Sequence, residues 1–179
     1  MIKTHYNLLD LNQIVNNMKK TITILVLFTV NSLFSQNNFI LNNELKISNF
    51  SLELPENVLL INFGIIDAPT NYYNELTNET YLEYSAMNNS FFFQGNSLID
   101  FYLRNNHFYF MSPNIKVGND ISSISSLFPS SYNNREEIDN LGFIIIDIKL
   151  NNGNYSDVFI VINYNPQTNI ISNIHKGEF

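Results

Sequence analysis

A short pattern that occurs twice constrains the fold of this chain more than any other feature, with Ile115 standing 63 positions after Leu52. In each copy, two apolar residues separated by one position lead into a turn and then into a short apolar-periodic segment. The matching positions are Leu52, Leu54, Asn57, Val58 and Ile61 in the first copy and Ile115, Val117, Asp120, Ile121 and Ile124 in the second. An Asn or Asp side chain at the turn can accept hydrogen bonds from the free N–H groups of a first helical turn. Each copy therefore predicts a short amphipathic helix, ending near Gly64 in one and before Pro129 in the other.

Strand-forming segments follow both predicted helices. We expect strands at 81–84, 90–94, 97–104 and 108–111 after the first helix, and at 141–150, 158–164 and 170–175 after the second. Gln94-Gly95-Asn96-Ser97 predicts a hairpin turn, because Gly and Asn tolerate the positive φ that tight turns require. The prediction is an α+β fold, in which two repeated units of a short helix plus an antiparallel β-meander form one sheet with the helices on one face. The two units would span residues 47–112 and 113–179.

The beginning of the chain is typical of an export signal. Met18-Lys19-Lys20 is a short basic start, residues 21–34 carry no charge, and Ser35 is a small residue at which a leader peptidase can cut. We therefore expect a signal peptide at 18–35 and a linker at 36–46. Residues 1–17 would be either a start codon assigned too early or a disordered extension, so Met1 and Met18 both stay open as starts.

Two destinations follow from this signal. The uncharged run is shorter than the roughly 20 apolar residues that a membrane span needs, and Asn31 interrupts it. A cleaved signal is therefore the preferred interpretation, and an uncleaved anchor is the alternative. We expect a periplasmic or extracellular protein that has no membrane association once the signal is removed.

Charge excludes one class of partner. Residues 36–179 contain fifteen acidic and six basic residues, a formal charge of −9. Such a domain repels polyanions, so we expect no nucleic-acid partner. From 47 to 103 there is no Lys or Arg at all, although seven acidic residues lie there. This acidic stretch is either a solvated face or a surface for a basic partner or a divalent cation.

The second copy contains the motif Val117-Gly118-Asn119-Asp120-Ile121-x-x-Ile124-x-x-Leu127-Phe128-Pro129, of which 54–61 is a weaker version. With the meander that follows it, this motif resembles the tandem-repeat fold of the β-lactamase-inhibitory proteins. It is also similar to the small outer-membrane assembly lipoprotein domain that shares the unit. The resemblance covers about residues 46–179 and implies a fold rather than an activity. The chain has no Cys, and so lacks the lipid-bearing Cys of one relative and the disulfides of the other.

Residues that could carry catalysis are sparse. A Cys nucleophile is excluded, Gly-x-Ser-x-Gly is missing, and His107 and His175 stand isolated without zinc-ligand spacing. We therefore expect no catalytic residue, no metal and no cofactor. The alternative is a small hydrolase that uses acidic residues spaced by four, namely Glu75, Glu79 and Glu83. Such a hydrolase can act with the help of a bound metal ion or without one.

Aromatic residues on the central strands are the remaining functional signal. Strand alternation predicts that Tyr102, Arg104 and Tyr109 share one face of the sheet, which Phe143 and Phe159 can join. Tyr and Arg are favoured anchors in protein interfaces, although a curled sheet could instead bury both of its faces. The sequence therefore predicts an exported non-catalytic protein-binding domain, docking or inhibitor-like, whose partner is an unknown protein. A passive structural protein of the cell envelope is a further alternative.

Overall fold

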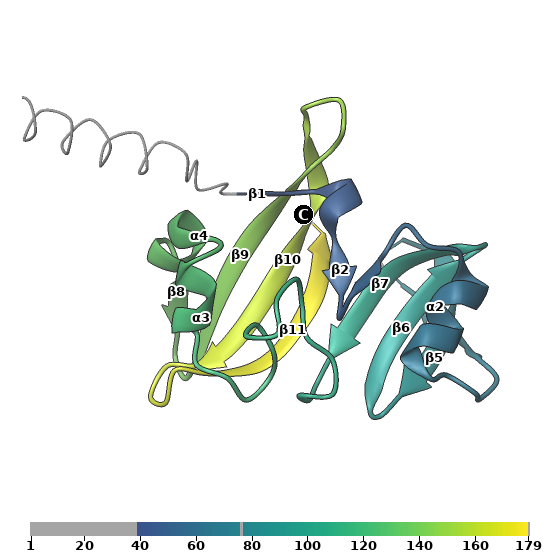
Figure 1. Ribbon diagram of the computed structural model, residues 1–179, viewed down its shortest axis with the longest axis horizontal. Helices are drawn as coiled ribbons and strands as arrows, with labels where there is room; N and C mark the ends of the chain where they lie inside the picture. The colour runs from purple at the N-terminus through teal and green to yellow at the C-terminus, as the bar shows by residue number, and fades with distance from the viewer. Residues whose placement is uncertain (1–38, 76, 179) are drawn as a thin grey trace, which may run out of the picture. The chain divides into compact units, whose positions relative to one another are not determined.

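Strands dominate the part of the chain that the computed structural model describes, residues 39–75 and 77–178 (Figure 1). The predicted signal peptide, the extension before it and the start of the linker lie outside these residues. Nine strands form one mixed sheet, and a separate hairpin joins β2 (Lys46–Ile47) to β3 (Phe50–Ser51). The strands of the large sheet are β1 (Phe39–Leu41), β4 (Thr70–Asn74), β5 (Glu79–Ala86), β6 (Asn89–Gln94), β7 (Ser97–Leu103), β8 (Glu136–Ile138), β9 (Leu141–Lys149), β10 (Tyr155–Asn165) and β11 (Ile170–Glu178).

The large sheet consists of two antiparallel meanders that meet at their last strands. Its order is β1-β9-β10-β11-β7-β6-β5-β4. The short strand β8 also pairs with β9, on the side of β9 that faces away from β10. The two meanders join where β11 pairs with β7, through the antiparallel register pairs Ile174–Leu103 and His175–Tyr102. Both halves therefore have strands in the order of a meander, with a short helical segment before it. A common origin of 47–112 and 113–179 stays a prediction.

Helices contribute little to this architecture in the described residues. The longest, α2 (Glu56–Phe63), has eight residues and ends at Gly64, whose φ of 68° gives the left-handed cap that the sequence predicts. In the second half, α3 (Ser122–Ser125) and α4 (Pro129–Asn133) have four and five residues. A 3-10 turn, η1 (Asn42–Glu44), follows β1. Pro129 separates α3 from α4, because it lacks an N–H and begins a new helix at its first position.

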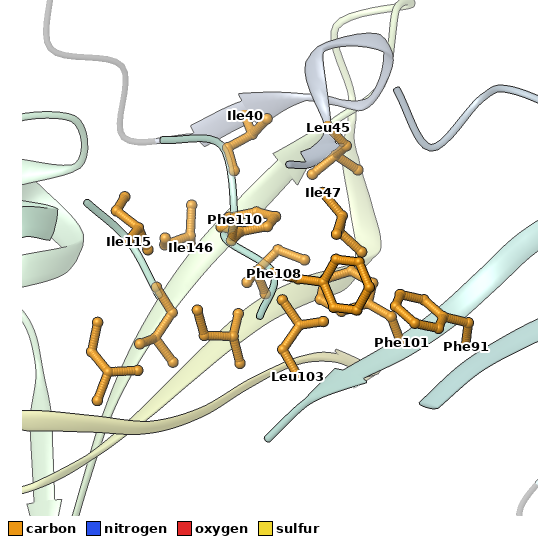
Figure 2. Packing of buried hydrophobic residues seen from close by; sticks show 14 of the residues in the cluster. Ile40, Leu45, Ile47, Phe91, Phe101, Leu103, Phe108, Phe110, Ile115 and Ile146 are labelled. Carbon is orange, nitrogen blue, oxygen red and sulfur yellow. The ribbon is translucent and has the colours of Figure 1, made fainter. Parts of the chain in front are cut away.

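The hydrophobic core lies on one side of the sheet and is closed largely by irregular chain (Figure 2). Phe91, Phe101 and Leu103 point from the strands into the core. Phe108 and Phe110 pack on them from the segment after β7. The ring of Phe110 stacks on Phe101 at a centroid distance of 6.1 Å. All these side chains are at most 5% exposed. Burial of aromatic side chains on this scale stabilises the fold by about 1.5–3 kcal/mol for each.

The expected fold class, α+β with helices covering one face of the sheet, is therefore wrong: the domain is mostly β. The physical reason lies in the segment 104–121, which was expected to contain a strand at 108–111. Four of its apolar residues, Phe108, Phe110, Ile115 and Ile121, are buried, but Phe110 makes only an isolated bridge with Ile47. An irregular segment thus supplies much of the cover that the helices were expected to provide, beside Leu59 and Phe63 of α2.

Several element boundaries also differ from the prediction. Asn57 was expected to cap the first helix, but Pro55 occupies the N-cap position and the helix starts at Glu56. Asp120 precedes α3 and does accept a hydrogen bond from the Ser122 N–H, at 2.7 Å. The edge strands β4 and β8 were not predicted, because all but one of their residues are exposed and show no apolar alternation.

Candidate functional site

The two faces of the large sheet differ in exposure. On β9, Ile144 and Ile146 point into the core and are fully buried, whereas Ile145 between them is 36% exposed. The same alternation runs through β10 and, interrupted by one register shift in each, through β11 and β7. We call the face opposite the core the outer face. Its apolar, aromatic and imidazole side chains on the central strands are Phe92, Tyr102, Phe143, Ile145, Phe159, Val161 and His175.

A single cross-strand row crosses the middle of the outer face. Residues that are directly opposite in neighbouring strands share a face and contact each other. The register places the row in the order Ile145, Val161, His175, Tyr102 and Ser90, on β9, β10, β11, β7 and β6. Because this row crosses the junction of the two meanders, both halves of the domain contribute to one surface.

Tyr102 lies between two partners, His175 and Arg104. Its ring stacks on the His175 imidazole at a centroid distance of 5.1 Å, with only 6° between the planes. The Arg104 guanidinium lies 4.2 Å from the centroid of the same ring, a cation–π geometry. The structure thus brings Tyr102 and Arg104 together as the sequence predicts, and adds His175.

Hydrogen bonds hold these side chains in place. The His175 Nδ1 lies 3.0 Å from the Lys176 carbonyl oxygen, which can only accept, so Nδ1 is the donor of this contact and Nε2 lies on the other side of the ring. The Asn163 amide nitrogen lies 3.3 Å from that Nε2 and also donates to Asn173 Oδ1 at 2.7 Å. The imidazole is therefore oriented by its neighbours in the sheet.

Arg104 is held in the same way, although it follows the end of β7. Its Nη1 donates to the Ser90 hydroxyl at 2.8 Å, and its backbone N–H donates to Asn89 Oδ1 at 2.8 Å. Asn89 is fully buried. These bonds hold the guanidinium against the Tyr102 ring, although Arg104 is exposed.

Phe143 and Phe159 also lie on the outer face, although not beside Tyr102. Phe143 is opposite Asn163, and Phe159 is opposite Asp147, so they stand on either side of the central row. The Phe159 ring covers Gly177, where an added Cβ would meet its Cε2 at 2.7 Å. Both side chains are half-buried and extend the apolar surface along β9 and β10.

The prediction that Tyr109 shares this face is wrong. Tyr109 belongs to the irregular segment on the core side of the sheet, between the buried Phe108 and Phe110. Its hydroxyl donates to Asn49 Oδ1 at 2.7 Å, and its carbonyl oxygen accepts from the Ser48 N–H. The alternation argument failed here because 108–111 is not a strand of the sheet.

The acidic residues of the alternative hydrolase do not stack on a helix. Glu79 and Glu83 lie on β5, and Glu75 follows the end of β4. Glu79 accepts a hydrogen bond from the Tyr81 hydroxyl at 2.8 Å. Within 39–75 and 77–178, no three acidic or imidazole side chains gather in a geometry that could hold a metal ion.

Shifted pKa values occur away from the outer-face row. The hydrogen bond to Glu56, together with burial, raises the pKa of Tyr84 to about 12. Burial and a hydrogen bond to Glu137 raise the pKa of Tyr164 to about 12. Hydrogen bonds from Ser122 lower the pKa of the Asp120 carboxyl. Each shift follows from a contact that closes a turn or joins neighbouring elements.

Hollows in the described surface include two that lie beside strands of the large sheet. The larger, about 280 Å³, lies where β7 and β11 diverge, and both Asp100 and Lys176 line it. The other, about 200 Å³, adjoins the outer face, where α4 and Glu136 face Phe143 and Ile145. Both volumes are below the roughly 300–1,000 Å³ of small-molecule sites, and the second lies beside Phe143 and Ile145 of the outer face.

Comparison of the chain with protein-family models, curated proteins and solved structures found no match. The resemblance to the β-lactamase-inhibitory proteins and the assembly lipoprotein domain therefore stays a prediction. In the sequence, His175 stands in the last predicted strand without another histidine nearby. Only the pairing of β11 with β7 brings it to Tyr102, and no local signal in the sequence specifies that pairing.

Proposed function

We propose that this domain is a non-catalytic binding protein that docks onto another protein through its outer face, centred on Tyr102. One observation carries the proposal: half-exposed aromatic, aliphatic and Arg side chains form a continuous surface across both meanders. Contiguous apolar surface on a soluble domain marks an interaction site. Tyr and Arg dominate the energetics of such sites.

The polar groups of the surface support docking more than catalysis. The polar side chains of this surface form hydrogen bonds with one another and with neighbouring strands. They are His175, Asn163, Ser90 and Arg104. A surface whose side chains are already ordered loses little conformational entropy on binding, which favours affinity. The formal charge of −9 on 36–179 supports a protein partner over a nucleic acid.

The place of action is part of the same proposal. The sequence pattern at 18–35 supports export to the periplasm or the cell exterior, and an uncleaved anchor is the alternative. In the described part of the chain, no helix has the length and apolarity to cross a membrane. Mass spectrometry of the N-terminus of the exported protein separates the cleaved form from the anchored one.

The docking proposal is tested by comparing two tyrosines, of which Tyr102 lies on the outer face and Tyr109 does not. The full chain, Tyr102→Ala and Tyr109→Ala are each used to capture partners from the native cell envelope, followed by quantitative mass spectrometry. Loss of a hot-spot residue costs at least about 2 kcal/mol, so we expect Tyr102→Ala to weaken capture of a specific partner more than about tenfold. Tyr109→Ala should capture that partner as the parent chain does.

Stability is the control for this comparison. Thermal unfolding of both variants should stay within a few degrees of the parent, because both tyrosines are only half-buried. Equal capture by Tyr102→Ala and the parent would refute the outer face as the docking site. Equal loss by both variants would refute it as well.

A further inference from the structure

A second surface of the domain lies at the end of the large sheet. The strand β4 is the last in the order and pairs only with β5 among the described residues. Four of its five residues are exposed. An edge strand presents unpaired N–H and C=O groups at every second residue, which can pair with another extended chain.

Within its five residues, β4 has no charge, Pro or bulge to block strand addition, although Pro69 directly precedes it. Its sequence, Thr70-Asn71-Tyr72-Tyr73-Asn74, contains no Lys, no Pro and no other charged residue. Its pairing with β5 runs through five consecutive register pairs without a bulge. Natural sheets normally block such edges with charges, Pro or bulges, so the open edge is itself an informative feature.

On the outer face, the edge has an aromatic side chain at its centre and acidic side chains near both ends. Tyr72 lies in the middle of β4, and its ring contacts Phe92 at a centroid distance of 5.0 Å. At the two ends, Thr70 is opposite Glu83 and Asn74 is opposite Glu79. The edge therefore offers an aromatic centre flanked on both sides by a carboxylate one strand further in.

We propose that β4 pairs with an extended basic segment of another polypeptide, in which two basic residues four positions apart flank a central apolar residue. The apolar residue would pack on Tyr72. Each basic residue would stand two strand spacings, about 10 Å, from Glu83 or Glu79. A Lys or Arg stem and a Glu side chain together can span this gap over the short Thr70 or Asn74.

Charge argues for this occupant over a second copy of the chain. The stretch 47–103 contains no Lys or Arg, so pairing of β4 with its own copy would bring four carboxylates to one edge without a compensating cation. These carboxylates would lie about three strand spacings apart, so a second copy gains no ionic attraction at this edge. The same carboxylates attract a basic strand. The edge therefore favours a basic segment over a second copy of the chain.

A synthetic peptide tests the site directly. The probe contains Lys-Thr-Val-Thr-Lys between two Thr residues on each side, and the matched control replaces both Lys by Glu. We expect the basic peptide to shift the backbone amide signals of residues 70–74 in NMR titrations of the full chain. Its apparent Kd should be at least about tenfold lower than that of the acidic peptide, because ionic attraction turns into repulsion.

Two variants locate the interaction. Asn71→Lys places a positive charge on an exposed position of the edge and should weaken binding of the basic peptide at least several-fold. Glu83→Gln should do the same without altering the edge. Tyr102→Ala, which tests the outer face, should leave peptide binding unchanged, so failure of one proposal is distinguishable from failure of the other.

Three results would overturn the edge proposal. They are equal binding of the basic and acidic peptides, amide shifts that spare 70–74, and no shift with either peptide. Dimerisation of the chain that Asn71→Lys abolishes would instead assign the edge to a second copy.

Discussion

Asn89 shows how single residues stabilise this domain. It is fully buried, and its amide nitrogen donates to the carbonyl oxygens of Ala86 and Met87 and to Asn105 Oδ1. Its Oδ1 accepts from the Arg104 backbone N–H. A buried amide that is satisfied in this way links the β5–β6 turn to the end of β7, which places Arg104 beside Tyr102. Removing it would leave several buried polar groups unpaired.

The pair Tyr84–Glu56 predicts a pH effect at the residue scale. The folded pKa of Tyr84 is raised from 10.0 to about 12, so the folded state holds this proton more tightly than the unfolded state. The resulting stabilisation is complete below pH 10 and is lost as pH rises through 12. Glu56→Gln removes the charge, and the Tyr84 pKa should fall toward 10.

Ultraviolet absorbance of tyrosinate against pH measures this shift. Subtracting the titration of Tyr84→Phe isolates the signal of Tyr84 in the parent and in Glu56→Gln. An unchanged midpoint in Glu56→Gln would show that the hydrogen bond to Glu56 does not control the pKa.

Between elements, two glycines allow aromatic rings to lie across the second meander. Gly142 on β9 is opposite Tyr164 on β10, and Gly177 on β11 is opposite Phe159 on β10. Tyr164 points into the core and is fully buried, while Phe159 lies on the outer face. Each ring occupies the space that a side chain would otherwise fill, so these pairs fix the register of three neighbouring strands.

Substitution of the two glycines should have unequal effects. A Cβ at Gly142 would lie 2.2 Å from Tyr164 Cζ in the closed core, whereas a Cβ at Gly177 would meet the edge of Phe159, which can turn toward solvent. Gly142→Ala should therefore lower the free energy of unfolding by about 1–3 kcal/mol or more, and Gly177→Ala by less. Urea unfolding of both variants measures the order, and the reverse order would contradict this account.

For the whole molecule, the two meanders share one core despite their short junction. The strands β7 and β11 are joined by only two register pairs. The buried cluster nevertheless runs without a break from Phe91 and Phe101 to Ile146 and Ile162. The segment 104–121 packs on this cluster and pairs with the last hairpin, since the Gly118 N–H donates to the Ile171 carbonyl oxygen.

A continuous core predicts that the domain unfolds as one unit. We expect a single thermal transition, because neither half can keep its apolar residues buried without the other. Intensities of amide NMR signals from β6 and from β10 should fall together on heating. Separate transitions for the two strands would show that the halves are independently stable domains.

Local elements of the fold were predictable from sequence, and long-range pairings were not. The end of α2 at Gly64 and the hairpin turn at Gly95, with a φ of 61°, follow from residues within a few positions of each turn. The apolar run 108–111 was expected to be a strand and is not, because apolar residues such as Phe108 and Phe110 are buried equally well in irregular chain. The same distinction explains Tyr109, whose face could not be deduced from alternation.

The amino-acid sequence by itself determined that the chain turns at Gly64 and Gly95 and that Tyr102 and Arg104 lie close together, since both depend on neighbours in the chain. Tertiary structure alone decided that β11 lies beside β7, that His175 stacks on Tyr102, and that irregular chain closes the core. The reason is physical: turns and alternation depend on the conformational preferences of a few consecutive residues. The pairing of distant strands depends on the free energy of the whole packed core.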